Sequence, residues 1–266
     1  MIQKTLPLVA QQIVKNGQLF PLTFVIVIAA LAFMSYYLGR RGKVFEIRPL
    51  EALDAIYEGV GRCAEMGRPI MILPGTSGLG VADTIAGLTL LGEVTQRGAE
   101  IGVDTYTTAS NTDVIAFCEA VVKSAYEKAG KGERYAPGEF VRWFGGDQYA
   151  YAVGTAGQIV AVKPGMLVIM GDMLSDVIVS FETGSRIGAQ LIGGCLRVLP
   201  EMSVFADYLL IGEEIFAASA MISRNNRVVA TLASQDWLKL ICVTLMILGV
   251  ILGLAKNNWL VNLTRM

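Results

Sequence analysis

A glycine-rich stretch from Gly75 to Gly80 is the part of the sequence best suited to binding a ligand. It reads GTSGLG and follows the apolar run Pro69–Leu73. The backbone N–H groups of such a loop, with the start of a following helix, can hold a phosphate. The spacing differs from the dinucleotide fingerprint, and the loop lacks the Lys-Ser/Thr pair of a P-loop. A tight turn is the favoured interpretation, and the alternative is a nucleotide or phosphate site formed by Gly75, Thr76, Ser77, Gly78 and Gly80.

Four acidic residues form a second candidate set, because each lies just after a short apolar run that ends in glycine. They are Asp147 (preceded by Gly146), Asp172, Glu213 and Glu214. Carboxylates at helix starts cap the helix and interact with its dipole, which contributes about 0.3–1 kcal/mol each. They can also hold Mg²⁺ or a cationic ligand. Capping is the favoured interpretation, a ligand-binding role is the alternative, and no metal site is predicted.

The composition excludes several catalytic systems. The chain has no histidine and four widely spaced cysteines, so Ser-His-Asp and Cys-His nucleophiles are excluded and a zinc site is disfavoured. Ser77, Thr76 and Cys195 would need activation by lysine or a carboxylate. No catalytic residue is predicted, the sequence does not identify a cofactor, and an enzyme is less expected than a non-catalytic protein. The net charge of −1 and the lack of a basic stripe argue against nucleic-acid binding.

The elements that must position these residues alternate between short apolar runs and longer helical patterns. The runs are Pro69–Leu73, Ile101–Thr107, Val141–Phe144, Met166–Met170, Gln190–Ile192 and Tyr208–Ile211, with RVVATLA near residue 230 as one further candidate strand. Nearly continuous apolar strands separated by helices are typical of a parallel sheet covered on both faces. We therefore predict an α/β, Rossmann-like fold, in which ligands bind beyond the carboxyl ends of the strands.

Two uncharged apolar runs flank this region. Leu22–Leu38 and Leu240–Ala255 approach the roughly 20 residues needed to cross a bilayer. Basic residues such as Arg40, Arg41 and Lys43 place the central region on the cytoplasmic side by the positive-inside rule. The predicted organisation is an extracytoplasmic N-terminus (1–20), a transmembrane helix (21–39), a cytoplasmic α/β domain (40–236), a second transmembrane helix (237–256) and an extracytoplasmic tail (257–266).

Two helical segments are rich in small residues and nearly uncharged. They read YAYAVGTAGQIVAV, starting at Tyr149, and EEIFAASAMIS, starting at Glu213. Small residues allow helices to approach closely, and a helix that is apolar all round must be buried. We therefore expect a homo-oligomer, which can belong to a larger membrane complex.

Four stretches carry a resemblance to a known family: EALDAIYEGVGRCAEMGRPIMILPG, GGDQYAYAVGTAG, ETGSRIGAQLIGG and YLLIGEEIFAASAMIS followed by QDWLKL. Their order resembles an uncharacterised family of two-span membrane proteins of bacteria and archaea, with a domain of unknown function. The resemblance covers the chain from about Arg48 to the second apolar run. It implies a membrane-anchored domain and assigns no activity, cofactor or site residue.

Three functions are consistent with these features. The expected one is a membrane-anchored, non-catalytic scaffold or assembly subunit that homo-oligomerises through its cytoplasmic domain. The first alternative is a membrane-tethered module that binds or senses a nucleotide or phosphate ligand. The second is a carboxylate- or metal-dependent enzyme that uses the four strand-end acids.

Overall fold

The chain forms two compact units in the computed structural model, which describes residues 19–40, 48–196, 199–223 and 226–254. One unit comprises Ile47–Arg224. The other combines Met1–Glu46 with Asn225–Met266. The candidate ligand residues all belong to the first unit, which is described first.

Six parallel strands form one sheet in the Ile47–Arg224 unit. They are β1 (Ile70–Gly75), β2 (Thr105–Ala109), β3 (Val141–Trp143), β4 (Met166–Asp172), β5 (Gln190–Cys195) and β6 (Tyr208–Ile211). Their order across the sheet is β3-β2-β1-β4-β5-β6, and every neighbouring pair is parallel. The predicted parallel, Rossmann-like sheet is therefore confirmed, and its order reverses between β1 and β4, as in doubly wound folds.

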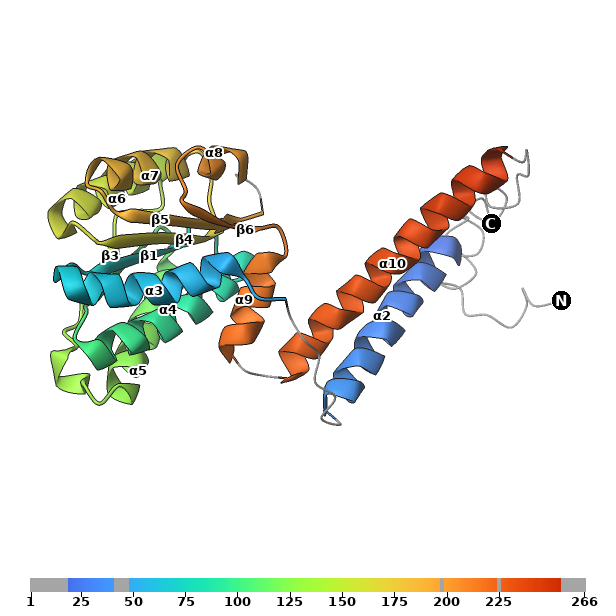
Figure 1. The fold of residues 1–266 in the computed structure, drawn as a ribbon, viewed down its shortest axis with the longest axis horizontal. Helices are drawn as coiled ribbons and strands as arrows, with labels where there is room; N and C mark the ends of the chain where they lie inside the picture. The colour runs from blue at the N-terminus through green and yellow to red at the C-terminus, as the bar shows by residue number, and fades with distance from the viewer. Residues whose placement is uncertain (1–18, 41–47, 197–198, 224–225, 255–266) are drawn as a thin grey trace. The chain divides into compact units, whose positions relative to one another are not determined.

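Helices cover both faces of this sheet (Figure 1). One face carries α3 (Glu51–Met66), α4 (Ala82–Ile101), α5 (Thr112–Lys128) and α9 (Glu214–Ser223). The other carries α6 (Gln148–Val162), α7 (Asp176–Arg186) and α8 (Leu199–Ser203). A short 3-10 turn, η2 (Gly132–Arg134), lies between α5 and β3.

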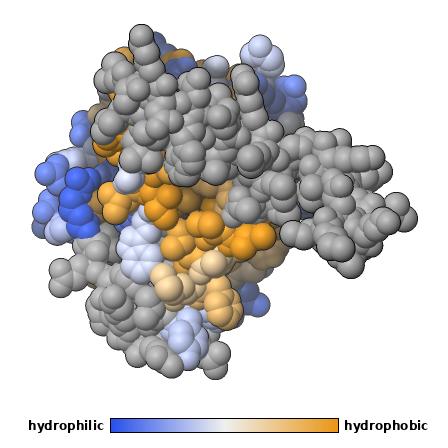
Figure 2. Space-filling model, turned by 90° about the vertical axis from the view of Figure 1, so that its right-hand side faces the viewer, coloured by the Kyte–Doolittle hydropathy of each residue, from blue (hydrophilic) through white to orange (hydrophobic). Residues whose placement is uncertain are grey.

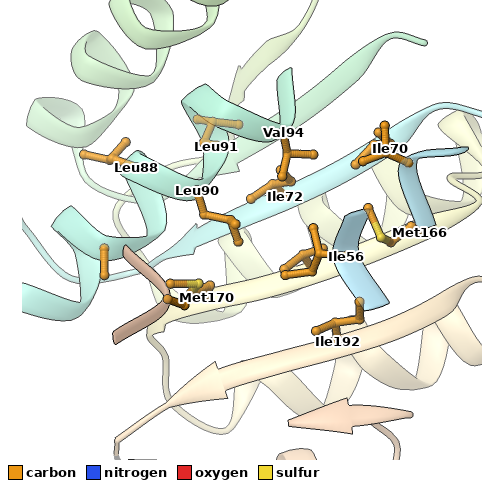
Figure 3. Packing of buried hydrophobic residues seen from close by; sticks show 14 of the residues in the cluster. Ile56, Ile70, Ile72, Leu88, Leu90, Leu91, Val94, Met166, Met170 and Ile192 are labelled. Atoms are coloured by element: carbon orange, nitrogen blue, oxygen red, sulfur yellow. The ribbon is translucent and has the colours of Figure 1, made fainter. Parts of the chain in front are cut away.

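The larger core lies between the sheet and the face formed by α3 and α4 (Figure 3). Ile56 of α3 and Leu90 of α4 are fully buried and lie over Ile72, Met170 and Ile192 of three strands. Alternate residues of a strand point to opposite faces. Met71 and Leu73 of β1 accordingly belong to the second core, under α6 and α7. Burial of both faces explains why the strands are nearly continuously apolar.

A buried polar group connects β2 to α6 within the second core. The Thr108 hydroxyl donates to the Tyr151 hydroxyl over 3.2 Å and lies 3.2 Å from the hydroxyl of Thr155. Both α6 residues are fully buried. Because buried hydroxyls are costly without partners, these contacts fix which side of α6 faces the sheet.

Two strand predictions are wrong in detail. The run Ile101–Thr107 does not start as a strand, because α4 continues to Ile101 and β2 begins only at Thr105. Gly102, with a φ of +85°, ends that helix in the left-handed conformation. The segment RVVATLA is also not a strand, because it lies in α10 (Asn226–Leu254), a continuous helix of 29 residues. Helical context there outweighs the β propensity of its valines and threonine.

The second unit contains α2 (Leu19–Arg40) and α10, which pack side by side (Figure 1). Large apolar side chains on both helices are exposed, among them Phe33 at 70% and Met246 at 63%. Apolar side chains gather on the face of the molecule drawn in Figure 2. Among the described residues, no helix combines the length and apolarity needed to cross a membrane, so the structure does not confirm the two predicted spans. Of the predicted N-terminal segment 1–20, residues 1–18 lie outside the described residues, as do the predicted tail 257–266 and Arg41 and Lys43.

Candidate ligand site at the β1–β4 crevice

The loop after β1 and the loop after β4 meet where the strand order reverses. From β1 the chain continues into α4 on one face of the sheet, and from β4 it continues into α7 on the other. Chains that leave neighbouring strands toward opposite faces open a crevice at the carboxyl edge, which is where open α/β sheets bind ligands. The sequence-predicted loop Gly75–Gly80 and Asp172 both lie at this position.

Two glycines allow the backbones of β1 and β4 to approach closely at this edge. Gly75 has a φ of +101°, and a Cβ there would lie 2.6 Å from the carbonyl oxygen of Asp172. A Cβ on Gly171 would lie 1.9 Å from the carbonyl oxygen of Pro74. The register between the strands shifts at the same point, between Leu73 and Gly75. Glycine is therefore required at both positions by the chain's own backbone.

Ser77 and Thr76 attach the glycine-rich loop to the end of β4. The Ser77 hydroxyl donates to Oδ2 of Asp172 over 2.5 Å. The Thr76 backbone N–H and hydroxyl both donate to the Asp172 carbonyl oxygen, over 2.9 and 3.3 Å. The structure thus brings together four of the predicted residues: Gly75, Thr76, Ser77 and Asp172.

The rest of the loop has more open space around it. A Cβ on Gly78 would lie 3.1 Å from Nδ2 of Asn111, whereas a Cβ on Gly80 would meet no atom within 4 Å. The Gly78 carbonyl accepts from the N–H of Val81 and closes a turn before α4. Gly80 is therefore exposed, with open space around it.

The N-terminus of α4, like that of α7, has no side-chain cap, whereas α5 and α6 have one. Its N-cap residue is Val81, which offers no side-chain cap. By contrast, Asn111 caps α5 through its side chain, and Asp147 caps α6 by accepting from the N–H groups of Tyr149 and Ala150 over 3.0 Å. The first N–H groups of a helix have no partner within the helix, and they favour negative charge. The start of α4, next to the loop, is thus a suitable position for an anionic group.

Two residues that the sequence analysis did not assign to the ligand site join Asp172 in a buried cluster. Ligating atoms of Asp83, in the first turn of α4, and of Cys195, at the end of β5, lie within 4.8 Å of each other and of an Asp172 oxygen. All three side chains are buried. The acid at Asp83 follows the glycine-rich loop by three residues, which was the available sequence signal. The proximity of Cys195 depends on the strand order.

This cluster could supply two oxygen donors and one sulfur donor to a divalent cation. Neighbouring donors around a tetrahedral Zn²⁺ lie roughly 3.3–3.8 Å apart, given its usual bond lengths, so small side-chain movements would suffice. Carboxylates and a thiolate together suit Zn²⁺ better than Mg²⁺, which prefers oxygen alone. The residues present fit such an ion.

The remaining predicted residues lie elsewhere along the carboxyl edge. Gly146 and Asp147 follow β3, at one end of the sheet. Glu213 and Glu214 follow β6, at the opposite end. Glu214 pairs with Arg48 over 2.5 Å and accepts from the N–H of Ile211 over 2.9 Å. The four predicted acids are therefore distributed over three strand ends and do not form one centre.

A further buried acid, Asp176, lies in the first turn of α7. Its Oδ1 accepts from the Leu174 N–H over 3.0 Å and from the Gln148 side chain over 3.4 Å. Its Oδ2 is buried and has no hydrogen-bond partner among the described residues. Burial raises the pKa of this carboxyl above its ordinary value, and the hydrogen bonds only partly oppose that shift. The group therefore favours the neutral form more than a solvated aspartate does.

Three further potentially reactive side chains, Arg186, Cys63 and Cys118, are accounted for by the fold. Arg186 pairs with Glu182 over 2.6 Å on the exposed side of α7. Burial raises the pKa of the Cys63 thiol to about 11 and that of Cys118 to about 12, so neither is a thiolate at neutral pH.

Comparison with known proteins agrees with the resemblance found in the sequence. No curated protein matches the chain. A family model described as a domain of unknown function, DUF6754, matches residues 9–264. That match covers nearly the whole sequence and confirms the expectation of an uncharacterised domain family. The chain therefore belongs to the DUF6754 family.

Proposed function

We propose that the protein is a membrane-anchored module that binds a phosphate-bearing ligand, such as a nucleotide, at the β1–β4 crevice. The observation that carries this proposal is the hydrogen bond between Ser77 and Asp172. It places the glycine-rich loop and the uncapped start of α4 at the reversal point of the strand order. This is the position at which doubly wound sheets bind nucleotides.

Charge at the crevice restricts the ligand further. The α4 N-terminus favours an anion, but Asp83 and Asp172 are buried close to the same loop. Carboxylates repel a bare phosphate, and a divalent cation between the two removes that repulsion. The ligand that suits both features is therefore a nucleotide, or another phosphate compound, that arrives with a divalent cation.

Membrane anchoring is supported by the two uncharged runs, Leu22–Leu38 and Leu240–Ala255. The first lies within α2, and nearly all of the second lies within α10. Val25, Phe33 and Val250 have exposed apolar side chains. Transfer of such side chains from water to lipid is favourable. Basic flanks such as Arg40 orient the α/β unit toward the cytoplasm under the positive-inside rule. Resistance to alkaline carbonate extraction is the expected result, and release into the supernatant would contradict anchoring.

A thermal-shift titration of the full-length protein in lipid nanodiscs tests the ligand proposal. ATP and GTP, each with and without Mg²⁺, Mn²⁺ or Zn²⁺, are the probes. Binding at one hundred times the dissociation constant stabilises the native state by about 2.7 kcal/mol, which shifts the melting temperature measurably. The expected result is a shift that needs the nucleotide and the cation together.

Gly80→Val tests whether that ligand lies in the crevice. A Cβ at Gly80 meets no atom within 4 Å, so the fold should tolerate the change, while under this proposal the added methyl groups would obstruct a ligand held by the loop. Gly61→Val on α3 is the matched control, because that exposed glycine also has open space around it. Shifts in the wild type and the control, with none in Gly80→Val, are expected. An equal shift in all three proteins would place the ligand elsewhere, and no shift in any would refute the proposal.

A non-catalytic scaffold that assembles through the α/β unit is the second candidate function. It is favoured by the outward side of α6, where Tyr149 is 80% exposed and Val153 is 72% exposed. Exposed apolar side chains of this kind are typical of a surface that contacts another protein. Large homogeneous particles together with a silent ligand screen would favour this function over the first.

A further inference from the structure

Trp143 is an exposed aromatic side chain whose orientation is fixed by a hydrogen bond. It is the last residue of β3 and is 53% exposed. Its indole Nε1–H donates to the Ser110 carbonyl oxygen over 2.9 Å, and Ser110 directly follows β2. The ring therefore extends from the end of β3 toward the end of β2. Covering such a ring is favourable, and because the ring is already ordered, a ligand that contacts it loses little entropy.

The indole lies on the same face of the sheet as the start of α4. Alternate residues of a strand point to opposite faces, and Val141, two residues before Trp143, belongs to the core on the α3–α5 face. Trp143 thus points to the face that carries α4 and α5, which lie side by side (Figure 1). The uncapped start of α4 is the anion position of the proposed site. The aromatic ring and the anion position therefore share one side of the carboxyl edge.

The residues after β2 connect the glycine-rich loop to Trp143. Asn111 caps α5 and follows Ser110, and its Nδ2 lies 3.1 Å from the position of a Cβ on Gly78. The loop after β1, the Ser110–Asn111 turn and the indole therefore follow one another along the carboxyl edge. Neighbouring strands are about 4.8 Å apart, so the ends of β1 and β3 are separated by roughly 10 Å. A nucleotide spans a comparable distance from its terminal phosphates to its base.

We propose that Trp143 stacks on the base of a nucleotide whose phosphates lie at the Gly75–Gly80 loop. This inference rests on the proposed function and narrows it, because a phosphate compound without a planar aromatic group does not make the contact. Every base has a π face, so the stack adds affinity without selecting one base. ATP and GTP should therefore bind with similar affinity, and both should bind more tightly than a phosphate chain alone.

ATP and inorganic triphosphate form a matched pair of probes. With the same cation, both bring a phosphate chain to the loop, but only ATP carries a base. Calorimetric titration of the full-length protein in mild detergent should give a dissociation constant that is about 5- to 100-fold lower for ATP. Equal dissociation constants would overturn the stacking proposal and leave the proposed function intact. Binding of neither compound with Mg²⁺, Mn²⁺ or Zn²⁺ would refute the proposed function, and this inference with it.

Trp143→Ala and Tyr208→Ala form a matched pair of variants. Both remove an exposed aromatic side chain, but Tyr208 begins β6 and lies at the amino edge of the sheet. Trp143→Ala should weaken ATP binding about 5- to 100-fold and leave triphosphate binding unchanged, whereas Tyr208→Ala should change neither. Trp143→Phe keeps a ring and should recover most of the ATP affinity, which separates stacking from damage to the fold. Equal ATP affinity in the wild type and Trp143→Ala would overturn the proposal.

Fluorescence of Trp143 provides a second readout that leaves the ring in place. Trp237 and Trp259 are the other tryptophans of the sequence, and both lie outside the Ile47–Arg224 unit. In a Trp237→Phe, Trp259→Phe background, saturating ATP should quench the Trp143 emission, because a stacked base quenches an indole. Inorganic triphosphate should leave the emission nearly unchanged. Emission that responds to neither compound, or to both equally, would contradict a base stacked on Trp143.

Discussion

The Ser77 hydroxyl lies 2.5 Å from Oδ2 of Asp172 and joins two loops that are 95 residues apart in the sequence. The contact holds the glycine-rich loop against the end of β4, at the centre of the carboxyl edge. Ser77 follows β1 and Asp172 ends β4, and the strand order reverses between these two strands. The position of the loop therefore depends on one hydroxyl–carboxylate contact as well as on the backbone.

Ser77→Ala tests that contact. A hydrogen bond to a charged group contributes about 1.5–3 kcal/mol, so the melting temperature should fall by roughly 3–10 °C. Ser203→Ala is the control, because its hydroxyl donates to the nearby Pro200 carbonyl at an exposed helix and should change stability little. Equal melting temperatures for the wild type and Ser77→Ala would show that the backbone alone holds the loop.

Gly75→Ala should destabilise the protein more than the same substitution does at a left-handed glycine with open surroundings. Gly75 has a φ of +101°, and the added Cβ would also lie 2.6 Å from the Asp172 carbonyl oxygen. Strain and overpacking together should lower the free energy of unfolding by about 2–5 kcal/mol. Gly138→Ala, with a φ of +74° and no atom within 4 Å, carries the strain alone. Chemical denaturation that gives the two variants the same loss would argue against the close approach of β1 and β4.

Two further glycines should respond in opposite directions. Gly61→Ala should raise the free energy of unfolding by about 0.5–1 kcal/mol, because alanine suits a helix interior and the site is open. Gly87→Ala should lower it, because the added Cβ would lie 2.0 Å from the Met170 carbonyl oxygen. That backbone atom cannot move aside cheaply, so the loss should be about 1–3 kcal/mol or more. If chemical denaturation showed changes in the free energy of unfolding with the same sign for both variants, the packing of α4 on β4 would be contradicted.

The raised pKa of Asp176 predicts a pH-dependent contribution to stability. The folded pKa lies above the unfolded value, so the contribution is fully present below about pH 3.8 and is lost as the pH rises through the folded pKa. Gln148 from α6 and the Leu174 N–H face its carboxyl, and the Tyr151 hydroxyl is close enough to sense its charge. The melting temperature of the wild type, measured against Asp176→Asn, should therefore fall between pH 4 and pH 7. A constant difference across this range would contradict the shift.

The sequence predicts the class of fold because alternation of apolar strands and helices reflects burial of both sheet faces. Five of the six strand runs, from Pro69–Leu73 to Tyr208–Ile211, overlap their strands closely. Ile101–Thr107 fails at its start, because an apolar residue at a helix end looks like the start of a strand. RVVATLA fails because its β-branched residues fit a long helix as well.

The candidate site was only partly predictable, because strand order decides which loops meet. Ser77 and Asp172 each follow a strand, and the reversal between β1 and β4 brings them together. Glu213 and Glu214 have the same sequence signature but follow β6 at the edge of the sheet. Asp83 and Cys195 lack a motif of their own, and only the three-dimensional arrangement places them beside Asp172.

Gly171 and Pro74 hold the ends of β4 and β1 in close contact. A Cβ on Gly171 would lie 1.9 Å from the Pro74 carbonyl oxygen, so no side chain fits between the strands there. The floor of the crevice is therefore backbone, which sequence variation at other positions does not alter. Selectivity among ligands would then be set by the wall formed by Thr76–Val81, so exchanging that loop is a route to new binding preferences on an unchanged base.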